Sequence, residues 1–257
     1  MKTGIFTIGI WVSMAAVLFT GCNDHWHKVE GNYDVESETR SLPEFDRVIN
    51  EGNFDVYIIQ DELSKVEIEA ESNLIPLIHT KVDGDVLEID TKDNLQNNYP
   101  MKVYVHTTDI SEVKLSGTGL IHVDDVTTGD LELGLSGSGY IFFSGTTEDL
   151  DCSISGSGSA DIGITANSIN ADISGSGEME IWGVADRGDF NISGSGAIHA
   201  YELLLQECYA KISGSGDMQV TVEDYLNVNI SGSGSIYYMG SPIIESKITG
   251  SGDIIHP

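Results

Sequence analysis

The chain has 257 residues, of which 12 are Lys or Arg and 41 are Asp or Glu, so its formal net charge is −29. This length allows one elongated domain or two small ones. So acidic a chain repels nucleic acid and anionic lipid headgroups, which excludes nucleic-acid binding and membrane attachment through basic residues.

The first 21 residues have the pattern of a lipoprotein signal peptide. Lys2 supplies a positive start, and the short apolar run over residues 5–19 leads to Cys22. Such a run fits a cleaved export signal better than a membrane span. Thr20 and Gly21 directly before Cys22 resemble a bacterial lipobox, whose cysteine is lipidated and becomes the first mature residue. An ordinary signal peptide with a chance cysteine is the alternative.

Lipidation of Cys22 predicts a protein of the cell envelope, anchored to the outer membrane at its periplasmic face or at the cell surface. Residues 22–42 then form a polar segment that we interpret as the tether between the lipid and the folded part. His25 and His27 flank Trp26 in this segment. The two histidines could share a metal ion, but we favour a flexible tether.

Residues 43–112 contain strand-like segments without a regular repeat. These segments are residues 45–50, 54–60, 66–71, 86–91 and 102–107. The stretch from Ile49 to Val56 resembles a degenerate copy of the glycine-rich corners farther on, and Pro76 weakens a helical turn over residues 73–80. We interpret this part as irregular β coils that begin and cap a solenoid, because an open end would expose unpaired strand edges. A separate small β-domain is the alternative.

Residues 113–257 repeat one tetrapeptide, Ser-Gly-Ser-Gly with Thr at two of the hydroxyl positions. The first residues of its eight successive copies are separated by 20, 19, 19, 19, 20, 18 and 18 residues. A fixed short period predicts a stack of like units that bury their faces against one another. The glycines allow sharp corners. We expect this structural role for Gly117, Gly119, Gly137, Gly139, Gly156, Gly158, Gly175, Gly177, Gly194, Gly196, Gly214, Gly216, Gly232, Gly234, Gly250 and Gly252.

Alignment on the tetrapeptide gives columns of apolar residues. The position directly before it is Leu or Ile in all eight copies, and the positions three before, five after and seven after are mostly apolar. The position six after is mixed, so we expect it to point outward. This alternation is typical of half-buried strands.

The fold class that we predict is all-β, a parallel β-helix or β-solenoid with coils of about 19 residues. Such coils stack about 4.8 Å apart. An up-and-down barrel would not require the same four residues at every second turn. A propeller blade needs about 40 residues, more than this repeat provides.

Cys152 and Cys208 both fall in inward columns. Three coils separate them, which is about 14 Å along the axis, whereas a disulfide requires Cα atoms within about 7 Å. We therefore predict two free, buried thiols that pack as small hydrophobic side chains.

Several segments together resemble one known family. They are Phe-Asp-Arg-Val at residues 45–48, Gly-Asn-Phe-Asp-Val at 52–56, the strand at 85–89 and the serial tetrapeptides behind a lipobox. This combination resembles the DUF2807 family, described as a putative auto-transporter adhesin, head GIN domain. The resemblance covers about residues 43–257. It implies adhesion, and it carries over no catalytic or ligand residues.

We predict no catalytic site and no cofactor. Acidic residues are so abundant that chance pairs are expected, mostly at turns, where Asp is favoured. The pairs are Asp124 with Asp125, Asp149 with Asp151, Asp186 with Asp189 and Glu223 with Asp224. Calcium prefers carboxylate and carbonyl oxygens and stays an open alternative, although the Gly-Gly-x-Gly-x-Asp pattern of calcium β-rolls is absent.

The predicted function is a non-catalytic adhesin or binding module that presents a rigid acidic rod to a glycan, a matrix component or another envelope protein. Solenoids commonly use such extended surfaces. Stacked corner hydroxyls are one candidate strip, and Tyr140, Phe142, Tyr237 and Tyr238 are aromatic candidates. A structural or assembly component of the envelope is the first alternative, and a carbohydrate-active enzyme is the second.

Overall fold

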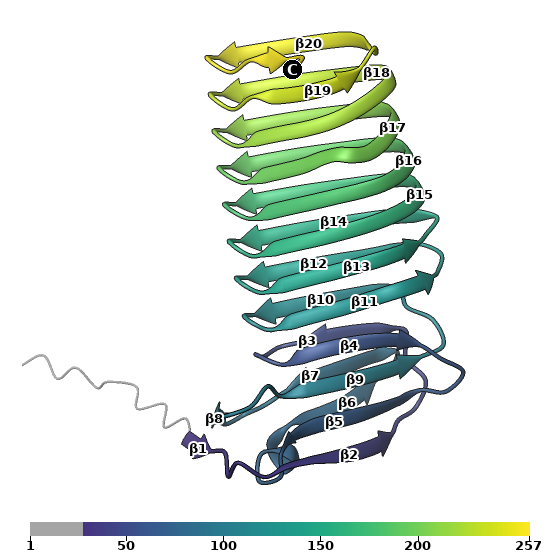
Figure 1. Cartoon of the computed structure of the whole chain (residues 1–257), viewed down its shortest axis with the longest axis vertical. Coiled ribbons are helices and arrows are strands. Elements are labelled where there is room, and N and C mark those ends of the chain that lie inside the picture. The colour runs from purple at the N-terminus through teal and green to yellow at the C-terminus, as the bar shows by residue number, and fades with distance from the viewer. Residues whose placement is uncertain (1–27) are drawn as a thin grey trace, which may run out of the picture.

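The computed structural model describes residues 28–257 as a stack of parallel β coils (Figure 1). The predicted β-solenoid, with coils of about 19 residues, is confirmed. The predicted signal peptide, Cys22 and the two tether histidines lie outside the described residues. No helix within residues 28–257 is long and apolar enough to cross a membrane.

Each regular coil has one strand that enters a tetrapeptide corner and one that leaves it. The first entering strands are β10 (Glu112–Gly117), β12 (Leu131–Gly137) and β14 (Asp149–Gly156), and the first leaving strands are β11 (Leu120–Thr127) and β13 (Tyr140–Thr146). Later coils merge the two into β15 (Ser159–Gly175), β16 (Glu178–Gly194), β17 (Ala197–Gly214) and β18 (Asp217–Gly232). The stack ends in β19 (Ile236–Gly240), β20 (Ile243–Gly250) and β21 (Ile254–Ile255).

Opposite the corners, the later coils bend without interrupting the strand. Gly183 lies at such a bend inside β16 and has φ of 119°. The chain bends there while the parallel ladder to β15 continues through the bend. Continuous pairing is possible because every neighbouring coil bends at the same place, so no loop is needed.

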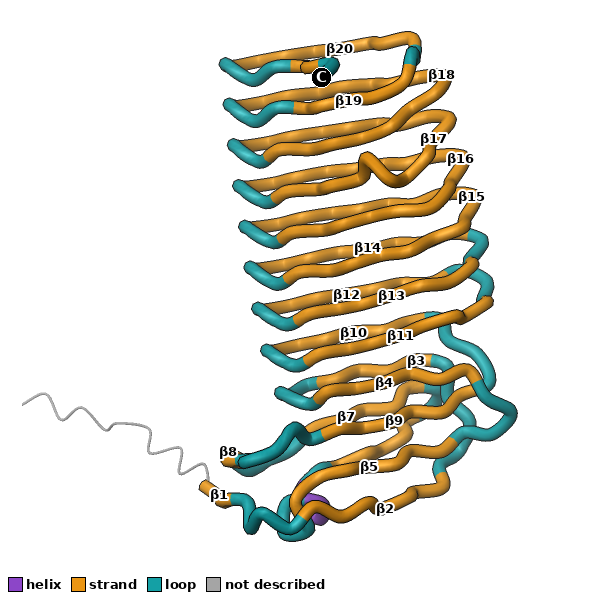
Figure 2. The backbone as a smooth tube through the Cα atoms, in the orientation of Figure 1, coloured by secondary structure: helices purple, strands orange, loops and turns teal. Residues whose placement is uncertain are grey.

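The corners stack in register along one side of the rod (Figure 2). Ser155 pairs with Ser136 on one side and with Ser174 on the other. Backbone hydrogen bonds continue through the corner, as in Ser157 N to Gly137 O at 2.9 Å. The corner is therefore part of the ladder rather than an interruption of it.

The predicted inward columns form one continuous core. Their members are buried from the first repeat to the seventh, except for half-buried Tyr238. The eighth repeat differs, because no further coil covers it within the described residues. There Ile248 is 42% exposed, although its counterpart one coil earlier, Ile230, is fully buried.

The irregular part continues the same sheet. β3 (Arg47–Asn50) pairs in parallel with β10, and β4 (Asp55–Gln60) pairs with β11, so residues 51–54 occupy the place of a corner. β7 (Val86–Asp90) and β9 (Lys102–Thr107) continue the stack below them. The end of the rod is covered by antiparallel strands, β5 (Lys65–Glu71) on β9 and β6 (His79–Asp83) on β7. Between β5 and β6 lies one 3-10 turn, Ile75–Leu77.

The predicted tether is shorter than expected, because part of residues 22–42 is folded. β1 (Lys28–Glu30) pairs with β8 (Asn94–Gln96), and β2 (Val35–Ser41) pairs antiparallel with β5. The strand β2 has few apolar residues, so its sequence gives little sign of a strand. Its backbone pairing with β5 at the edge of the sheet accounts for its order.

Candidate binding face

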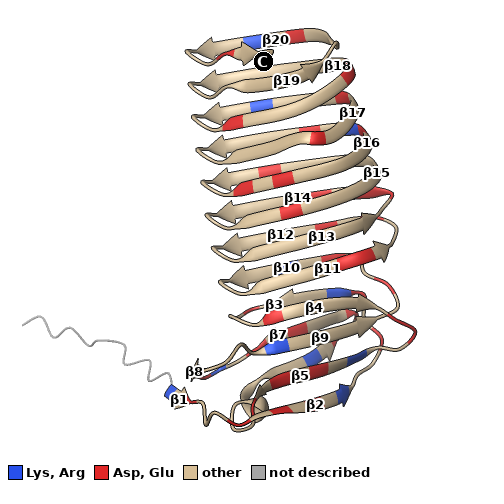
Figure 3. Ribbon diagram, in the orientation of Figure 1, with Lys and Arg blue, Asp and Glu red and all other residues tan. Residues whose placement is uncertain are grey.

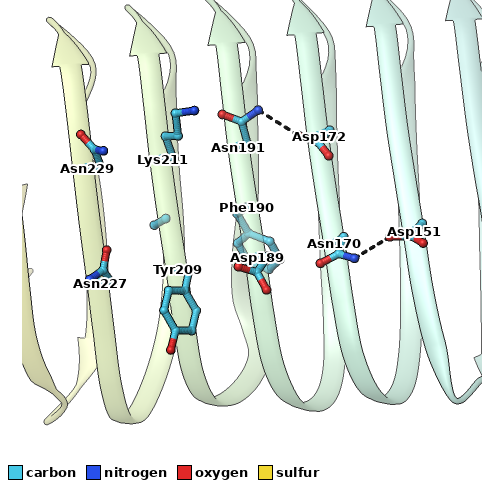
Figure 4. A pocket seen from close by; sticks show the side chains of 11 residues that line it. Asp151, Asn170, Asp172, Asp189, Phe190, Asn191, Tyr209, Lys211, Asn227 and Asn229 are labelled. Carbon is cyan, nitrogen blue, oxygen red and sulfur yellow. Dashed lines mark hydrogen bonds between the residues drawn. The ribbon is translucent and has the colours of Figure 1, made fainter.

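Two rows of outward side chains follow the entering strands along the rod. We name these rows the polar face (Figure 4). Its first row is Asp151, Asn170, Asp189, Tyr209 and Asn227, and its second row is Asp172, Asn191, Lys211 and Asn229. Consecutive members of a row are direct register partners in neighbouring strands from β14 to β18. Polar side chains therefore recur about every 4.8 Å along the rod.

Neighbouring amides and carboxylates in the polar face are hydrogen-bonded to each other. Asn170 Nδ2 donates to Asp151 Oδ1 at 2.5 Å, and Asn191 Nδ2 donates to Asp172 Oδ1 at 2.9 Å. An amide has two N–H donors and a carbonyl acceptor, and a carboxylate has several lone pairs. The hydrogen bond within each pair therefore fixes the orientation of both side chains, and the remaining donors and acceptors stay available to a ligand.

The polar face borders a shallow open groove of about 410 Å³. The nine side chains line it together with Phe190 and Ala210. The groove crosses five strands, so its long dimension follows the stacking direction of the coils. Its shape suits an extended polymer better than a compact small molecule.

The charge of the polar face is mixed but predominantly acidic. Arg187 Nε pairs with Asp189 Oδ2 at 2.7 Å, and its guanidinium carbon lies 4.2 Å from the centre of the Tyr209 ring. Acidic residues are spread along the whole rod (Figure 3). This field disfavours ligands that carry phosphate, sulfate or carboxylate groups.

The leaving strands carry a row of aromatic rings on the other face. Ring centres of Tyr57 and Tyr104 are 5.2 Å apart, and those of His122 and Phe142 are 4.5 Å apart, both pairs being stacked. Trp182 follows at 6.2 Å from Phe142. In the two stacked pairs each ring covers one face of its neighbour, whereas Trp182 is tilted by 45° against Phe142. All five rings are half-buried, so the row stabilises the stack and exposes only part of each ring.

The four aromatic candidates from the sequence do not form one exposed row. The Tyr140 hydroxyl donates to Asp161 at 2.5 Å, and burial together with this carboxylate raises the pKa of Tyr140 to about 12. Phe142 belongs to the stack, Tyr237 is half-buried, and Tyr238 packs on the core and against His256.

The stacked corner hydroxyls are rarely hydrogen-bonded to one another. The tetrapeptide hydroxyl residues are exposed, and within residues 28–257 the one bond between two of these hydroxyls joins Ser251 to Ser233 at 3.1 Å. Backbone groups make the bonds between corners instead, as in Ser176 N to Gly156 O at 2.9 Å. The corner serines therefore point to solvent without forming a rigid polar strip.

The two glycines of each corner have different structural roles. The first has a positive φ, between 122° and 136° in all eight corners. The second is buried and does not have this conformation, but the carbonyl oxygen of the preceding coil leaves no room for a side chain. At Gly177 a Cβ would lie 2.9 Å from Gly158 O and 2.6 Å from Ile154 Cγ2.

The acidic pairs do not assemble a metal site or an evident acid–base pair. Within residues 28–257, no three His, Cys, Asp or Glu side chains are arranged to hold a metal ion. Asp149 accepts a hydrogen bond from Ser168, and Asp151 and Asp189 are engaged by Asn170 and Arg187. The predicted free thiols are confirmed, since Cys152 and Cys208 are both unpaired and buried.

The model of the DUF2807 family, described as "Putative auto-transporter adhesin, head GIN domain", matches residues 44–242. The chain belongs to this family. A crystal structure of a putative lipid binding protein from Parabacteroides distasonis is 26% identical, with a TM-score of 0.84, over 89% of this chain and 100% of that chain.

Two further crystal structures have the same fold. A putative adhesin from Parabacteroides distasonis is 26% identical, with a TM-score of 0.82, over 88% of this chain and 98% of that chain. A putative adhesin from Parabacteroides merdae is 23% identical, with a TM-score of 0.83, over 89% of this chain and 99% of that chain. No curated protein matches the chain. The family and these neighbours are named as adhesins or as a binding protein, not as enzymes.

The polar face of this DUF2807 protein was not among the sequence-based candidates. Its two rows are the positions four and two before each tetrapeptide, which alternate with the inward columns. Collecting these positions across the repeats would have revealed the amides and carboxylates. The tetrapeptide itself is the strongest pattern in the sequence, and it marks the corners rather than the groove.

Proposed function

We propose that this DUF2807 protein is a non-catalytic, adhesin-like binding module that holds an uncharged glycan along the polar face. The observation that carries the proposal is the pair of in-register rows of polar side chains, mostly Asn and Asp, beside a groove that crosses five coils. A polymer with hydroxyl groups repeated along its length can make similar contacts in successive coils.

The chemistry of the polar face matches sugar hydroxyls. A hydroxyl donates one hydrogen bond and accepts others, so it can donate to Asp172 and accept from Asn191 at the same place. Many such contacts across a rigid surface add up without a deep pocket, because little ordering entropy is lost on the protein side. Three carboxylates and one lysine line the groove, and this acidic balance favours an uncharged glycan over a uronate polymer.

One structural neighbour is named as a lipid binding protein. The groove here is lined mainly by amide, carboxylate, hydroxyl and ammonium groups. Contact with an acyl chain would desolvate these groups without giving them partners. A hydroxyl-rich ligand is therefore the better fit for this face.

The adhesin-like family suggests a protein of the cell envelope or cell surface. We propose in addition that lipid on Cys22 attaches the rod to the outer membrane. β1 starts at Lys28, at the capped end of the rod, so such an anchor would hold β14 to β18, which carry the polar face, farther along the rod from the attachment point.

The proposal is tested by probing a glycan and matrix-protein array with the purified full chain, once with calcium and once with chelator. We expect saturable binding to uncharged glycans and unchanged glycan masses after long incubation. Binding only to matrix proteins would contradict the glycan assignment. A blank array in both buffers would favour an envelope scaffold, and shortened glycans would indicate an enzyme.

A further inference from the structure

The C-terminal end of the rod exposes the outer edge of β20, whereas the corresponding edges of earlier coils are covered by the next coil. Within the described residues, β20 pairs with β18 on one side and has no partner on the other. Ile244 and Ile248 of β20 lie in inward columns, yet they are 38% and 42% exposed. Their partners in β18, Leu226 and Ile230, are fully buried.

The opposite end of the rod is protected in the way typical of edge strands. There the outermost strand is β2, with the sequence Val-Glu-Ser-Glu-Thr-Arg-Ser, in which Val35 is the one apolar residue. Charged edge strands discourage pairing with other chains. β20, with the sequence Ile-Ile-Glu-Ser-Lys-Ile-Thr-Gly, has fewer charges and three isoleucines, so it is less well protected. The edge strand β20 is therefore better suited than β2 to pair with a strand of another chain.

We propose that β20 pairs antiparallel with β20 of a second copy of this chain, end to end about a twofold axis at Ser246. The sequence of β20 is complementary to itself in this register. Glu245 lies opposite Lys247 of the second copy, and Ile244 lies opposite Ile248. Each pair occurs twice because the interface is isologous.

The side-chain directions support this register. Directly opposite residues of an antiparallel pair point to the same face. Ile244, Ser246 and Ile248 occupy inward columns, so their pairing joins the two cores across the interface. Glu245 and Lys247 point outward, where opposite charges stabilise a cross-strand pair. Tyr225 OH donates to Glu245 Oε2 at 2.8 Å and holds this carboxylate in place.

End-to-end pairing has a geometric consequence for adhesion. The described chain begins at β1, at the far end of the rod from β20 (Figure 1). In the pair, the two N-terminal ends therefore lie at opposite ends of a doubled rod. Two chains attached to separate surfaces through their N-terminal segments would link those surfaces. The paired residues lie on β20, one coil beyond Asn227 and Asn229 of the polar face, and dimerisation is measured separately from glycan binding.

The test is the oligomeric state of the full chain, measured by sedimentation equilibrium over a range of concentrations. We expect the wild type to dimerise. Glu245→Lys and Lys247→Glu each turn both charge pairs into repulsive ones, so each should weaken the dimer by roughly tenfold or more. Lys211→Glu makes the same charge change in the same column two coils earlier and should leave the dimer intact.

Mixing the two charge variants provides the decisive measurement. A chain with lysines at positions 245 and 247 meets a chain with glutamates at both, so the mixture should form a heterodimer although each variant pairs only weakly with itself. The double variant Glu245→Lys with Lys247→Glu should pair as the wild type does. Circular dichroism confirms that every variant is folded. A monomeric wild type, or a dimer that is indifferent to these charges, would overturn the proposal.

Discussion

At the scale of single residues, the corner glycines show why the tetrapeptide repeats so strictly. Gly175 has φ of 130°, a conformation that residues with a Cβ rarely adopt. Gly177 is required for a different reason, since a Cβ there would overlap the carbonyl oxygen of Gly158 and a methyl group of Ile154. The first glycine permits the turn, and the second permits the next coil to approach.

Replacement of either glycine should destabilise the rod. We expect Gly175→Ala and Gly177→Ala each to lower the free energy of unfolding by about 1–3 kcal/mol, through backbone strain and through overlap respectively. Gly129→Ala is the matched control, because no atom lies within 4 Å of its Cβ position and its φ is not positive. It should change stability by less than about 0.5 kcal/mol. Urea unfolding of the three variants checks this, and equal stability of all three would contradict the corner geometry.

The two buried cysteines should be chemically inert in the folded protein. Burial, with a smaller contribution from Asp172, raises the pKa of Cys152 to about 12, and burial also raises the pKa of Cys208. A thiol of high pKa without access to solvent does not react at neutral pH. We expect an aromatic disulfide reagent to label neither thiol in the native chain and both in denaturant. Rapid labelling of native Cys152 would contradict its place in the core.

At the scale of elements, one charged cluster connects the irregular coils to the regular ones. Glu112 at the start of β10 is 5% exposed and contacts Arg47 of β3 and Lys114 of β10. Lys114 in turn pairs with Glu132 of β12 at 3.1 Å. Burial alone would raise the pKa of Glu112, but Lys114 and Arg47 outweigh it and hold this pKa below its ordinary value. The ionised carboxylate is therefore favoured in the folded chain.

This cluster predicts a pH-dependent contribution to stability. The pKa of Glu112 is lower in the folded chain than in the unfolded chain. Its contribution to stability is therefore complete at pH values above the unfolded-state pKa, and it is lost as the pH falls through the folded-state pKa. Glu112→Gln should lower the free energy of unfolding by about 1–3 kcal/mol at neutral pH. The difference in unfolding free energy between this variant and wild type should narrow below about pH 4.

Glu132→Gln serves as the control for this measurement, because its half-exposed side chain pairs with Lys114 alone. An exposed ion pair is worth less than about 1 kcal/mol. Urea unfolding at neutral and acidic pH compares the variants. If the difference in unfolding free energy between Glu112→Gln and wild type stays constant with pH, the carboxylate does not act through its charge.

The elements also show where sequence-based prediction succeeded. The five expected segments of residues 43–112 overlap β3, β4, β5, β7 and β9, because each has alternating or continuous apolar residues. The prediction missed β2, which has little apolar character, β6, a short partner of β7, and the three-residue strands β1 and β8. The spacing of 20 residues between Ser193 and Ser213 marks one extra residue, but only the structure places the resulting irregularity after Ala200 of β17.

At the scale of the whole molecule, the architecture could be predicted and the binding face could not. The period of the tetrapeptide determines a solenoid because only stacked coils place the same corner at each turn. Function is carried by outward side chains, and these are free to differ from coil to coil. The sequence therefore shows that outward columns exist without showing which column forms a groove. The groove depends on the side chains that the stack brings side by side.

The whole rod also combines two separate surfaces. The polar face runs along its length from β14 to β18, while the outer edge of β20 is open at its C-terminal end. A ligand on the first surface and a second copy on the other would not compete. An adhesin that binds glycan along its side and its own copy at its tip would link a surface to a polymer and to another rod at once.

The central claim is that the polar face holds the ligand, and calorimetric titration tests it most directly. The uncharged glycan that binds best on the array is titrated into wild type, into Asn191→Ala with Asn229→Ala, and into Gln219→Ala. Gln219 is an amide on β18 like Asn229 but lies on the opposite face.

We predict that the double variant binds at least about tenfold more weakly, since it loses several hydrogen bonds worth about 1 kcal/mol each. Gln219→Ala should bind as the wild type does, and all three proteins should have the same circular dichroism spectrum. Equal affinity of the double variant and the wild type would contradict the claim and place the ligand elsewhere on the rod.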